Sequence, residues 1–479
     1  MTEPRAITNI AEILVRPATA LGERPALIVD DGPVSYRQLR DESLRWAATL
    51  ASRGTAAGDH VALVDWGGLR AVAATLGAAH LGAATAHINP LLTPGERDQL
   101  VALAQCRVEV IGSDGLSAPD RPDAEAPAPT LGGNTDSLVL FTSGTTGLPK
   151  PVPISHASVL ARVRAYRAAF EPDRPPNTTI MCVPSFHVGG LLGLILNLWS
   201  GDTTVVQPRF EAGRWLELVE RHGVTSAFLV PTMIARILDH PRFNRTDLTR
   251  LTSIAYGAAA APTELIRRAM EALPEVAFAN VFGQTETLGA YTTLGPADHH
   301  DPLRVGSVGR PLAGVEIRIV DPATEAEVAN GDVGELWVRS PQSVTEGWLH
   351  TGDLGRCDAD GYLYPAGRLS ETINRGGEKF GPVEVAEAVR THPAVADVAV
   401  AGIPDAEMGE RVGVAVVVRA DHDKPTLDEL RAHCRDRLAT YKLPEVVVLV
   451  DWLPYNELGK LGRKAAAEII AGAHKGPQR

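Results

Sequence analysis

The sequence predicts an α/β protein with a large N-terminal domain of layered αβ sheets, a β-rich subdomain and a small C-terminal α+β domain. Three observations lead to this fold class. Strand-like apolar runs alternate with helical patterns over most of the 479 residues, which is typical of largely parallel sheets covered by helices. From Gly309 onward the pattern changes to short strands with Gly and Asp turns. After Arg368 a compact mixture of helices and strands follows, so we place the two domains at 1–368 and 369–479.

The individual elements follow in order from local patterns. A hairpin is expected around Asp30-Asp31-Gly32-Pro33, because Gly and Pro favour a chain reversal between two apolar runs. A helix at 36–51, a strand at 60–64 and a helix at 68–81 come next. Strands and helices continue to alternate over 179–206, 222–256 and 276–282. Short strands are expected at 315–320 and 334–339. In the C-terminal part, helices are expected at 383–391 and 427–438, and strands at 395–401 and 412–418. The segment 113–136, rich in Pro, Ala, Asp and Gly, is expected to be an exposed loop.

Composition is that of an ordinary globular protein and argues against some functions. Hydrophobic residues make up 44% of the chain and charged residues 22%. The formal net charge of −12 argues against a nucleic-acid partner, which needs a concentrated basic face. Four scattered cysteines without a CxxC pair, and an N-terminus without a basic and apolar leader, predict a reduced cytoplasmic protein. The longest apolar stretch, 188–196, is too short to span a bilayer.

Residues 141–152, Phe-Thr-Ser-Gly-Thr-Thr-Gly-Leu-Pro-Lys-Pro-Val, carry the strongest functional signal. The glycines allow a tight turn that directs N–H groups inward, the hydroxyls add donors, and Lys150 adds positive charge. These properties predict a cradle for a polyphosphate. The segment is not a Walker loop, because no Gly-Lys in the chain is followed by Ser or Thr. Taken alone, the segment also fits a flexible surface loop.

The run from Thr142 to Lys150 closely resembles the AMP-binding signature of the adenylate-forming superfamily, which includes acyl-CoA synthetases, adenylation domains of peptide synthetases and firefly luciferase. Together with the later motifs, the resemblance spans about residues 20–465. It implies that the nucleotide is bound by Thr142, Ser143, Gly144, Thr145, Thr146, Gly147 and Lys150. The superfamily usually has Gly-Val after the lysine, whereas this chain has Pro151-Val152. Proline stiffens the exit of the loop but leaves the hydroxyls and the lysine in place.

A second motif, Phe282-Gly283-Gln284-Thr285-Glu286, follows an apolar strand. An aromatic ring can stack on a base, a hydroxyl can hold a phosphate, and a carboxylate can bind Mg²⁺, which prefers oxygen ligands. Alone, the motif is better explained as an exposed turn. It resembles the superfamily's Tyr-Gly-x-Thr-Glu, with Phe in place of Tyr. The resemblance implies that Phe282 and Gly283 border the nucleotide, that Thr285 contacts the α-phosphate, and that Glu286 and Thr142 hold the metal.

Three further segments complete the predicted nucleotide site. Trp348-x-x-Thr351-Gly352-Asp353 resembles the superfamily's Trp-x-x-Thr-Gly-Asp, which implies that Asp353 and Arg368 bind the ribose, although Thr-Gly-Asp turns also arise by chance. Tyr256, Gly257 and Ala258 close a predicted strand, where small residues let a ligand approach the backbone. Close helix–sheet packing explains them as well. Lys460 matches the lysine that enters the site during adenylation, where a cation stabilises the developing negative charge. Its alternative is a solvated helix face.

The segment 367–379 resembles the superfamily's hinge and the loop after it. Ser370 stands where most acyl-CoA synthetases have lysine, and Glu371 keeps the usual acid. The resemblance implies that the C-terminal domain is mobile and rotates here. It would first present Lys460 to the site and then present Gly376 and Gly377 to the thiol of coenzyme A. Glycines leave room for a narrow thiol arm.

The segment 183–190 resembles the superfamily's Pro-x-x-His region beside the acyl pocket. His187 is expected to gate the pocket or orient the substrate, because a carboxylate needs no deprotonation near neutral pH. A structural histidine is the alternative. The expected pocket residues are Phe186, His187, Val188, Gly189, Ala259, Val281, Leu288 and Gly289. Val281 stands where malonate-type relatives have arginine, so the uncharged pocket favours a monocarboxylic acid with an apolar body. Its small residues indicate room for the acyl group.

The sequence therefore predicts an enzyme that uses Mg-ATP to convert a carboxylic acid to acyl-AMP, releases pyrophosphate and transfers the acyl group to CoA. CoA is preferred because the chain carries no fused carrier domain. Three alternatives stay open: loading of a separate acyl carrier protein, a luciferase-like oxidative second step, and a binding relative that has lost catalysis. The retained Lys150, Glu286, Asp353 and Lys460 argue against the last. A homodimer is common among relatives and is not tested by the sequence. The adjacent His299 and His300 are expected to be solvated.

Overall fold

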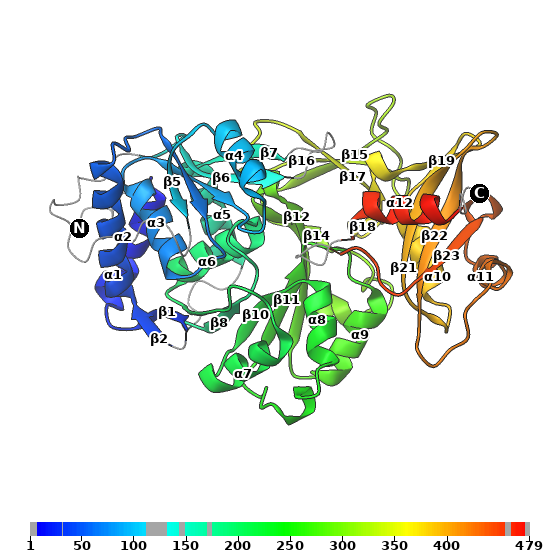
Figure 1. Ribbon diagram of the computed structural model, residues 1–479, viewed down its shortest axis with the longest axis horizontal. Helices are drawn as coiled ribbons and strands as arrows, with labels where there is room; N and C mark the ends of the chain where they lie inside the picture. Colours follow the sequence, from blue (N-terminus) through cyan, green and yellow to red (C-terminus); the bar gives the residue numbers. More distant parts are fainter. Residues whose placement is uncertain are drawn as a thin grey trace.

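The computed structural model describes residues 7–30, 32–111, 132–142, 149–169, 175–455 and 461–474. The molecule is elongated, with α1 (Val15–Ala20) and α12 (Arg463–His474) at opposite ends (Figure 1). Two large sheets form the N-terminal part, and a four-stranded sheet lies between them and the C-terminal domain (Figure 1). Among these residues, no helix has the length and apolar character that crossing a membrane requires.

The largest sheet has nine strands in the order β14-β13-β12-β11-β10-β8-β9-β1-β2. Strands from β12 to β1 run parallel. At the two ends, β2 is antiparallel to β1, β13 is antiparallel to β12, and β14 is antiparallel to β13. Their bounds are β1 (Pro25–Val29), β2 (Gly32–Ser35), β8 (Thr178–Met181), β9 (Thr203–Val206), β10 (Ser226–Leu229), β11 (Ser253–Gly257), β12 (Ala277–Gln284), β13 (Gly289–Leu294) and β14 (Arg310–Pro311).

The second large sheet has five strands in the order β5-β3-β4-β6-β7, and only β7 is antiparallel to its neighbour. Its strands are β3 (His60–Val64), β4 (Ala84–Ile88), β5 (Cys106–Ile111), β6 (Asp136–Thr142) and β7 (Lys150–Ser155). The helices of this part are α2 (Tyr36–Ser52), α3 (Leu69–His80), α4 (Pro94–Leu103), α5 (His156–Ala169), α6 (Val188–Ser200), α7 (Ala212–His222), α8 (Pro231–Leu238) and α9 (Thr263–Ala272).

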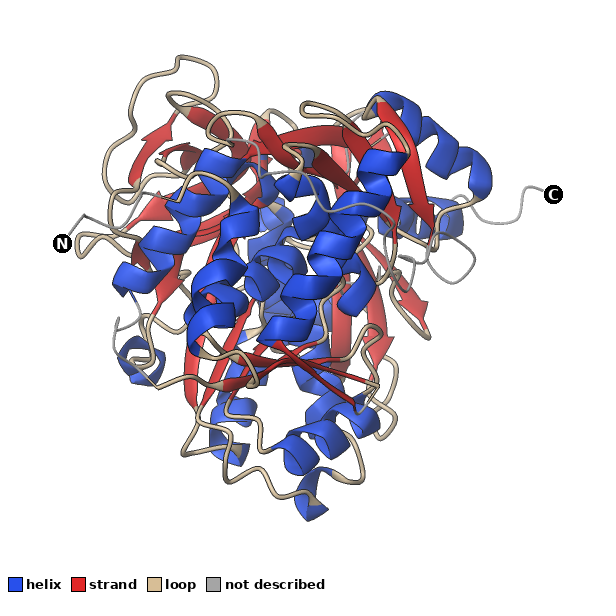
Figure 2. Cartoon of the chain, turned by 90° about the vertical axis from the view of Figure 1, so that its left-hand side faces the viewer, coloured by secondary structure: helices blue, strands red, loops and turns tan. Residues whose placement is uncertain are grey.

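Two cores hold these layers together. The first lies between the sheets, where α2, α3, α5 and α6 pack against Leu27 of β1 and Leu63 of β3. The second lies on the other face of the nine-stranded sheet, under α7, α8 and α9. Figure 2 shows helices in the middle of the N-terminal part with strands on either side. Burial of apolar side chains on both faces explains why these central strands are nearly continuous in hydrophobicity.

The β-rich subdomain and the C-terminal domain are smaller. The four-stranded sheet is antiparallel in the order β15-β16-β17-β18, with strands β15 (Glu316–Val320), β16 (Gly334–Arg339), β17 (Leu349–Cys357) and β18 (Leu363–Arg368). The C-terminal sheet joins β19 (Ile373–Arg375), β20 (Glu378–Phe380), β21 (Val395–Asp405), β22 (Gly409–Val418) and β23 (Val446–Val450), and it carries α10 (Pro382–Arg390), α11 (Leu427–Cys434) and α12.

The predicted fold class is confirmed, and most elements lie where the sequence places them. Capping boxes fix several helix starts, as at Ser35 with Gln38 before α2 and Thr93 with Glu96 before α4. The predicted helix at 427–438 is too long, because α11 ends at Cys434. The predicted loop at 113–136 lies mostly outside the described residues. β18 ends at the predicted domain boundary, and η5 (Leu369–Glu371) follows it; rotation at this point stays a prediction.

Candidate active site

The carboxyl ends of the parallel strands in the nine-stranded sheet meet at one edge, and several predicted site residues lie along it. β8 leads to Phe186 and His187, β11 ends at Gly257, and β12 leads into Thr285 and Glu286. In the sheet, β10 lies between β8 and β11. Open parallel sheets bind ligands in the crevice outside this edge. The edge is therefore the candidate active site.

Glycine is required at two predicted positions on this edge. Gly257 pairs with Val281 across β11 and β12, and a Cβ atom on Gly257 would overlap the Val281 carbonyl oxygen. A Cβ atom on Gly283 would overlap the Gly289 carbonyl oxygen. Both glycines thus serve strand–strand packing rather than helix–sheet packing. Beyond Gly257 the chain turns outward, with Ala258 exposed and Ala259 partly exposed.

Tyr256 supports β11 from the buried side of the sheet. Its side chain is 1% exposed in the second core, and its hydroxyl lies 2.9 Å from Nε2 of His299. Nδ1 of His299 lies 2.7 Å from the Gly295 carbonyl oxygen, so Nδ1 donates and Nε2 accepts. The expectation that His299 is solvated is wrong, because the ring is buried and burial lowers its pKa. Tyr256 therefore borders the edge through its backbone alone.

Residues 285–289, called the Glu286 turn below, carry the predicted metal ligand. η3 (Thr285–Thr287) is followed by Leu288 and Gly289, with φ angles of 50° and 88°. The Thr287 hydroxyl donates to the Gly289 carbonyl oxygen at 2.7 Å. Leu288 is fully buried in the first core and anchors the turn from inside. Glu286 is partly exposed, so its side chain remains accessible.

Two buried polar side chains brace the Glu286 turn. Nε2 of Gln342 donates to the carbonyl oxygens of Thr287 and Ala290, both at 3.0 Å. Nη1 of Arg162, on α5, donates to the Ala290 carbonyl oxygen at 3.1 Å and lies 3.5 Å from Oε1 of Gln342. Arg162 is 9% exposed, and burial lowers its pKa to about 10. Within the part of the chain that the structure describes, no carboxylate pairs with it, so its hydrogen bonds go to neutral oxygens.

Residues 351–353, called the Asp353 bulge below, lie inside β17. The sequence predicts a tight turn here, but the structure shows a break in register opposite Leu336 of β16. The Thr351 hydroxyl donates to the Leu336 carbonyl oxygen at 2.7 Å and accepts from the Asp353 N–H at 3.1 Å. The Gly352 N–H donates to Oε1 of the buried Glu335 at 3.0 Å. Bulges redirect side chains beside functional sites, and this one presents Asp353.

The two predicted ribose ligands lie together. Asp353 and Arg368 are opposite each other on β17 and β18, and Nε of Arg368 is 2.9 Å from Oδ1 of Asp353. The side chain of Asp353 is 12% exposed and that of Arg368 is 51% exposed. The carboxylate is thus shielded on one side and reachable on the other. This arrangement suits a group that accepts hydrogen bonds from two neighbouring hydroxyls.

Tyr291 connects the two predicted nucleotide motifs. Its ring packs edge-on against Phe282, with centroids 5.2 Å apart. The ring is fully buried, and among the described residues its hydroxyl has no hydrogen-bond partner. Burial raises the pKa of Tyr291, and the nearby Asp353 carboxylate adds to the rise. Phe282 is partly exposed, so one part of its surface is left for a flat ligand.

His187 precedes the first turn of α6 and belongs to a series of ring contacts. Its ring lies 4.6 Å from that of Phe186, and Phe186 meets Trp66 edge-on at 5.7 Å. The guanidinium of Arg209 stacks on Trp66 at 4.3 Å. Val188 and Gly189 begin α6 and are partly exposed. These contacts connect His187, which follows β8, to Arg209, which follows β9.

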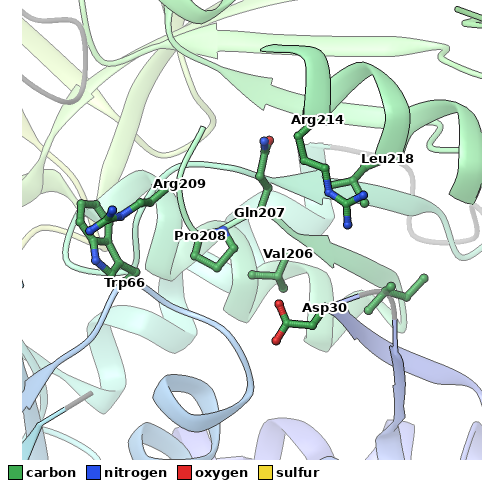
Figure 3. Close-up of a pocket in the computed structure, with 9 residues that line it drawn as sticks. Asp30, Trp66, Val206, Gln207, Pro208, Arg209, Arg214 and Leu218 are labelled. Atoms are coloured by element: carbon green, nitrogen blue, oxygen red, sulfur yellow. The ribbon is translucent and has the colours of Figure 1, made fainter. Parts of the chain in front are cut away.

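A cavity of about 400 Å³ lies at the carboxyl ends of β1 and β9. Its lining includes Asp30, Trp66, Gln207, Arg209 and Arg214 (Figure 3). Figure 3 shows Arg209 against Trp66 on one side and Asp30 on another. Because Trp66 also touches Phe186, Trp66 links the cavity to the segment that carries His187.

The predicted CoA loop lies in the β19–β20 hairpin. Gly376 and Gly377 have φ angles of 61° and 93°, and the Gly376 N–H donates to the Met408 carbonyl oxygen at 2.7 Å. A bidentate ion pair between Arg375 and Glu445, at 2.7 and 2.8 Å, holds the strand before the loop. At the predicted hinge, Ser370 is exposed and Glu371 is partly buried.

Comparison with known proteins identifies the family. Residues 14–130 and 114–349 match the AMP-binding enzyme family, and residues 384–460 match the C-terminal domain of AMP-binding enzymes. The chain belongs to the AMP-binding enzyme family. It is therefore a ligase of the adenylate-forming superfamily, as the sequence motifs predict.

Relatives within the AMP-binding enzyme family differ in acceptor. The chain is 30% identical to 4-coumarate–CoA ligase 3 of Oryza sativa subsp. japonica, over 94% of this chain and 90% of the relative. It is 29% identical to the fatty acid–[acyl-carrier-protein] ligase ScoC of Streptomyces coeruleorubidus, over 94% of each chain. Its structure resembles o-succinylbenzoate CoA synthetase (MenE) from Bacillus subtilis in complex with ATP and magnesium ion, with a TM-score of 0.83, 27% identity and coverage of 95% and 99%.

Several residues predicted for an AMP-binding enzyme fall outside the described part of the chain, namely Ser143, Gly144, Thr145, Thr146, Gly147 and Lys460. Thr142 ends β6 and Lys150 begins β7, so both flank that segment. The predicted metal ligands come from different sheets, Thr142 from the five-stranded sheet and Glu286 from the nine-stranded sheet. Among the described residues, no group of three or more His, Cys, Asp or Glu side chains is placed to hold a metal ion. One carboxylate and one hydroxyl fit Mg²⁺, which takes its remaining ligands from water and phosphates.

Sequence reasoning missed the residues that support the site in this AMP-binding enzyme. The sequence does offer a signal for Arg162, because this charged residue lies among the apolar Val159, Leu160 and Val163, which are buried on the same helix. Glu335, Gln342 and Tyr291 have no such signal, because each sits in a polar or alternating context. Their roles depend on which strands become neighbours.

Proposed function

We propose that this enzyme activates a monocarboxylic acid with an apolar body and transfers the acyl group to coenzyme A. The pairing of β11 with β12 carries the proposal, because it brings Gly257 and the start of the Glu286 turn to one edge of the sheet. The Asp353–Arg368 pair adds a carboxylate, 12% exposed, that can accept hydrogen bonds from ribose hydroxyls. The residues proposed to line the acyl space, Val281, Ala259 and Gly189, carry no charge.

The proposed chemistry has two steps. A carboxylate oxygen of the acid attacks the α-phosphorus of ATP, the bond to the β-phosphate oxygen breaks, and pyrophosphate leaves with the electron pair. The thiolate of CoA then attacks the acyl carbon, and AMP leaves as the phosphate anion. Bound Mg²⁺ would neutralise phosphate charge in the first step. Glu286 and Thr142 are proposed to hold the metal, Thr285 to contact the α-phosphate, and His187 to orient the carboxylate.

Lys460 and the hinge complete the proposal. A lysine beside the α-phosphorus stabilises the charge that develops in the first step, and one such donor is worth roughly 10²- to 10³-fold in rate. Rotation at Ser370 and Glu371 would then exchange Lys460 for the loop at Gly376 and Gly377. This exchange separates the adenylation and thioester steps in one active site.

A second acceptor is supported by one relative. ScoC, which covers 94% of this chain, is a fatty acid–[acyl-carrier-protein] ligase. Loading the phosphopantetheine of a carrier protein would use the same first step and the same thiol chemistry. The acceptor therefore decides how the test is designed.

The test is a pyrophosphate-release screen over mono- and dicarboxylic acids, with and without CoA, with products identified by mass spectrometry. We expect an acyl-CoA product from at least one monocarboxylic acid, and acyl-AMP without CoA. A Lys460→Ala variant should still bind ATP and lose most pyrophosphate exchange. Acyl-AMP that accumulates beside unused CoA would contradict the CoA assignment and favour a carrier protein. Turnover of malonate or succinate, with octanoate and benzoate inactive, would contradict the uncharged pocket.

A further inference from the structure

We infer that Phe228 sets the depth of the acyl-binding space, so that this enzyme activates compact acids, aryl or short-chain, in preference to long straight-chain acids. The inference rests on the proposed function, because it concerns the same site. Phe228 belongs to β10 and lies outside the motifs that the sequence analysis singles out.

The position of β10 in the sheet is the first observation. β10 lies between β8, which leads to His187, and β11, which ends at Gly257. A molecule that extends along the edge from one to the other must cross the end of β10. Phe228 is the second-last residue of that strand and is partly exposed, whereas its neighbour Leu229 is buried. Successive side chains of a strand point to opposite faces, so Leu229 points away from Phe228. The side chain that such a molecule meets is therefore the Phe228 ring.

The contacts of α6 are the second observation. A Cβ atom on Gly189 would lie 2.9 Å from Cε1 of Phe228, and a Cβ atom on Gly193 would lie 2.5 Å from Cε of Met181. The phenyl ring therefore occupies the space on the side of Gly189 where a Cβ atom would lie. These glycines let α6 approach the sheet closely.

The row of side chains across the sheet is the third observation. Met181, Phe228, Ala255 and Ala279 are in register on neighbouring strands and therefore point to one face. Met181 is buried, whereas Phe228, Ala255 and Ala279 are partly exposed. The bulky ring thus stands where the row changes from covered to accessible. An apolar body can lie over the two alanines, and the ring closes the space on the side of β8.

The test measures chain-length preference in three proteins. Wild type, Phe228→Ala and Leu229→Ala are assayed for pyrophosphate release with benzoate, hexanoate, laurate and palmitate. Leu229→Ala is the matched control, because it removes a large side chain from the next position on the other face. We expect wild type to prefer benzoate or hexanoate over laurate by at least about 10-fold in kcat/KM, the range that hydrophobic pockets reach. Phe228→Ala should raise kcat/KM for laurate by about 10-fold, because a large-to-small change leaves an apolar space. Leu229→Ala should leave the ratio of kcat/KM for laurate to that for benzoate unchanged.

A pair of variants protects the test against misfolding. Gly189→Ala should weaken turnover of every acid, because its methyl group meets the Phe228 ring, and Gly189→Ala with Phe228→Leu should regain most of the loss. Recovery in the double variant cannot arise from general destabilisation. Wild type that uses palmitate as well as benzoate would overturn the inference. An unchanged acid profile in Phe228→Ala, or an equal change in Leu229→Ala, would overturn it as well.

Binding separates this inference from the proposed function. The same acids are titrated into the three proteins by calorimetry in the absence of ATP. In one outcome, wild type releases no pyrophosphate and still binds benzoate, while Phe228→Ala binds laurate more tightly than wild type does. That result would contradict the proposed function and support the inference. A protein that binds none of the acids and releases no pyrophosphate would overturn both.

Discussion

The Asp353 bulge and the Glu286 turn each present one carboxylate, but different parts of the molecule hold them. The bulge is held within its own sheet, and the supporting Glu335 is 17 positions from Gly352. The turn is held from far away, by Gln342, which is 52 positions from Ala290, and by Arg162, which is 128 positions away. One carboxylate therefore depends on a local strand pair and the other on the assembly of the whole domain.

This difference has a consequence for how the site is coupled. Arg162 lies on α5, which begins directly after β7 and so follows the predicted phosphate-binding segment. A shift of α5 would reach the Glu286 turn through the Ala290 carbonyl oxygen, whereas the Asp353 bulge has no contact with α5 among the bonds described above. Through this bond the Glu286 turn is linked to the helix that follows the predicted phosphate-binding segment.

The largest expected effect comes from removing the distant brace. Arg162→Met should lower pyrophosphate exchange by roughly 100-fold, the loss that a small misplacement of a catalytic group can cause, and should raise the Mg²⁺ concentration needed for half-maximal rate. Arg164→Met, on the exposed side of the same helix, is the control and should change neither quantity. A normal Mg²⁺ requirement in a folded Arg162→Met protein would show that the brace does not position Glu286.

Gln342 sharpens the same comparison through a double-mutant cycle. Gln342→Met alone leaves two buried carbonyl oxygens with fewer donors, at a cost of about 1–3 kcal/mol in the free energy of unfolding. Because Arg162 and Gln342 share the Ala290 carbonyl oxygen, the double variant should be destabilised by less than the sum of the single variants. Chemical unfolding of the four proteins measures this. Strict additivity would mean that the two side chains act independently.

A smaller effect is expected from the local support. Glu335→Ala removes the acceptor of the Gly352 N–H and should raise the KM for ATP by about 10-fold, with kcat and the Mg²⁺ requirement little changed, because a charge-assisted bond of this kind is worth about 1.5–3 kcal/mol. In Glu335→Gln, the KM for ATP should fall between those of wild type and Glu335→Ala, because the amide oxygen can still accept from the Gly352 N–H. The amide nitrogen, however, would face the Trp337 Nε1–H, which in wild type donates to Oε2 of Glu335. A raised Mg²⁺ requirement in Glu335→Ala would erase the distinction between the two carboxylates.

The smallest effect concerns the Tyr256–His299 pair, which supports β11 from outside both carboxylate sites. The pKa of His299 is lowered in the folded protein. As the pH falls below about 6.5, His299 therefore binds a proton in the unfolded chain before it does so in the folded protein. Stability that is present at neutral pH is then lost on acidification, at no more than about 1.4 kcal/mol per pH unit for one group. Urea unfolding at pH 7.5 and 5.5 should show a flatter dependence in His299→Gln than in the control His300→Gln, whose side chain is exposed. Equal slopes would mean that His299 is protonated in the fold as easily as in the unfolded chain.

The elements and the motifs were accessible to sequence reasoning for different reasons. Strands such as His60–Val64 and helices such as α2 follow from hydrophobic period and capping residues, which are local properties. Asp353 and Arg368 were each predicted as a ribose ligand from separate motifs, and the structure places Nε of Arg368 2.9 Å from Oδ1 of Asp353, while their role toward a ribose stays a prediction. His299 was misjudged, because a polar loop context does not reveal what packs against a side chain.

The sequence by itself determined the order of strands and helices, the fold class, and the residue types that can meet a nucleotide and a metal, because these depend on local pattern and on the chemistry of each side chain. Only the tertiary structure decided that Arg162 braces the Glu286 turn, that Glu335 holds the Asp353 bulge and that Phe228 fills the space beside Gly189. Each of these contacts joins residues on different elements. Their proximity is set by sheet order and helix packing, which no single segment of the chain encodes.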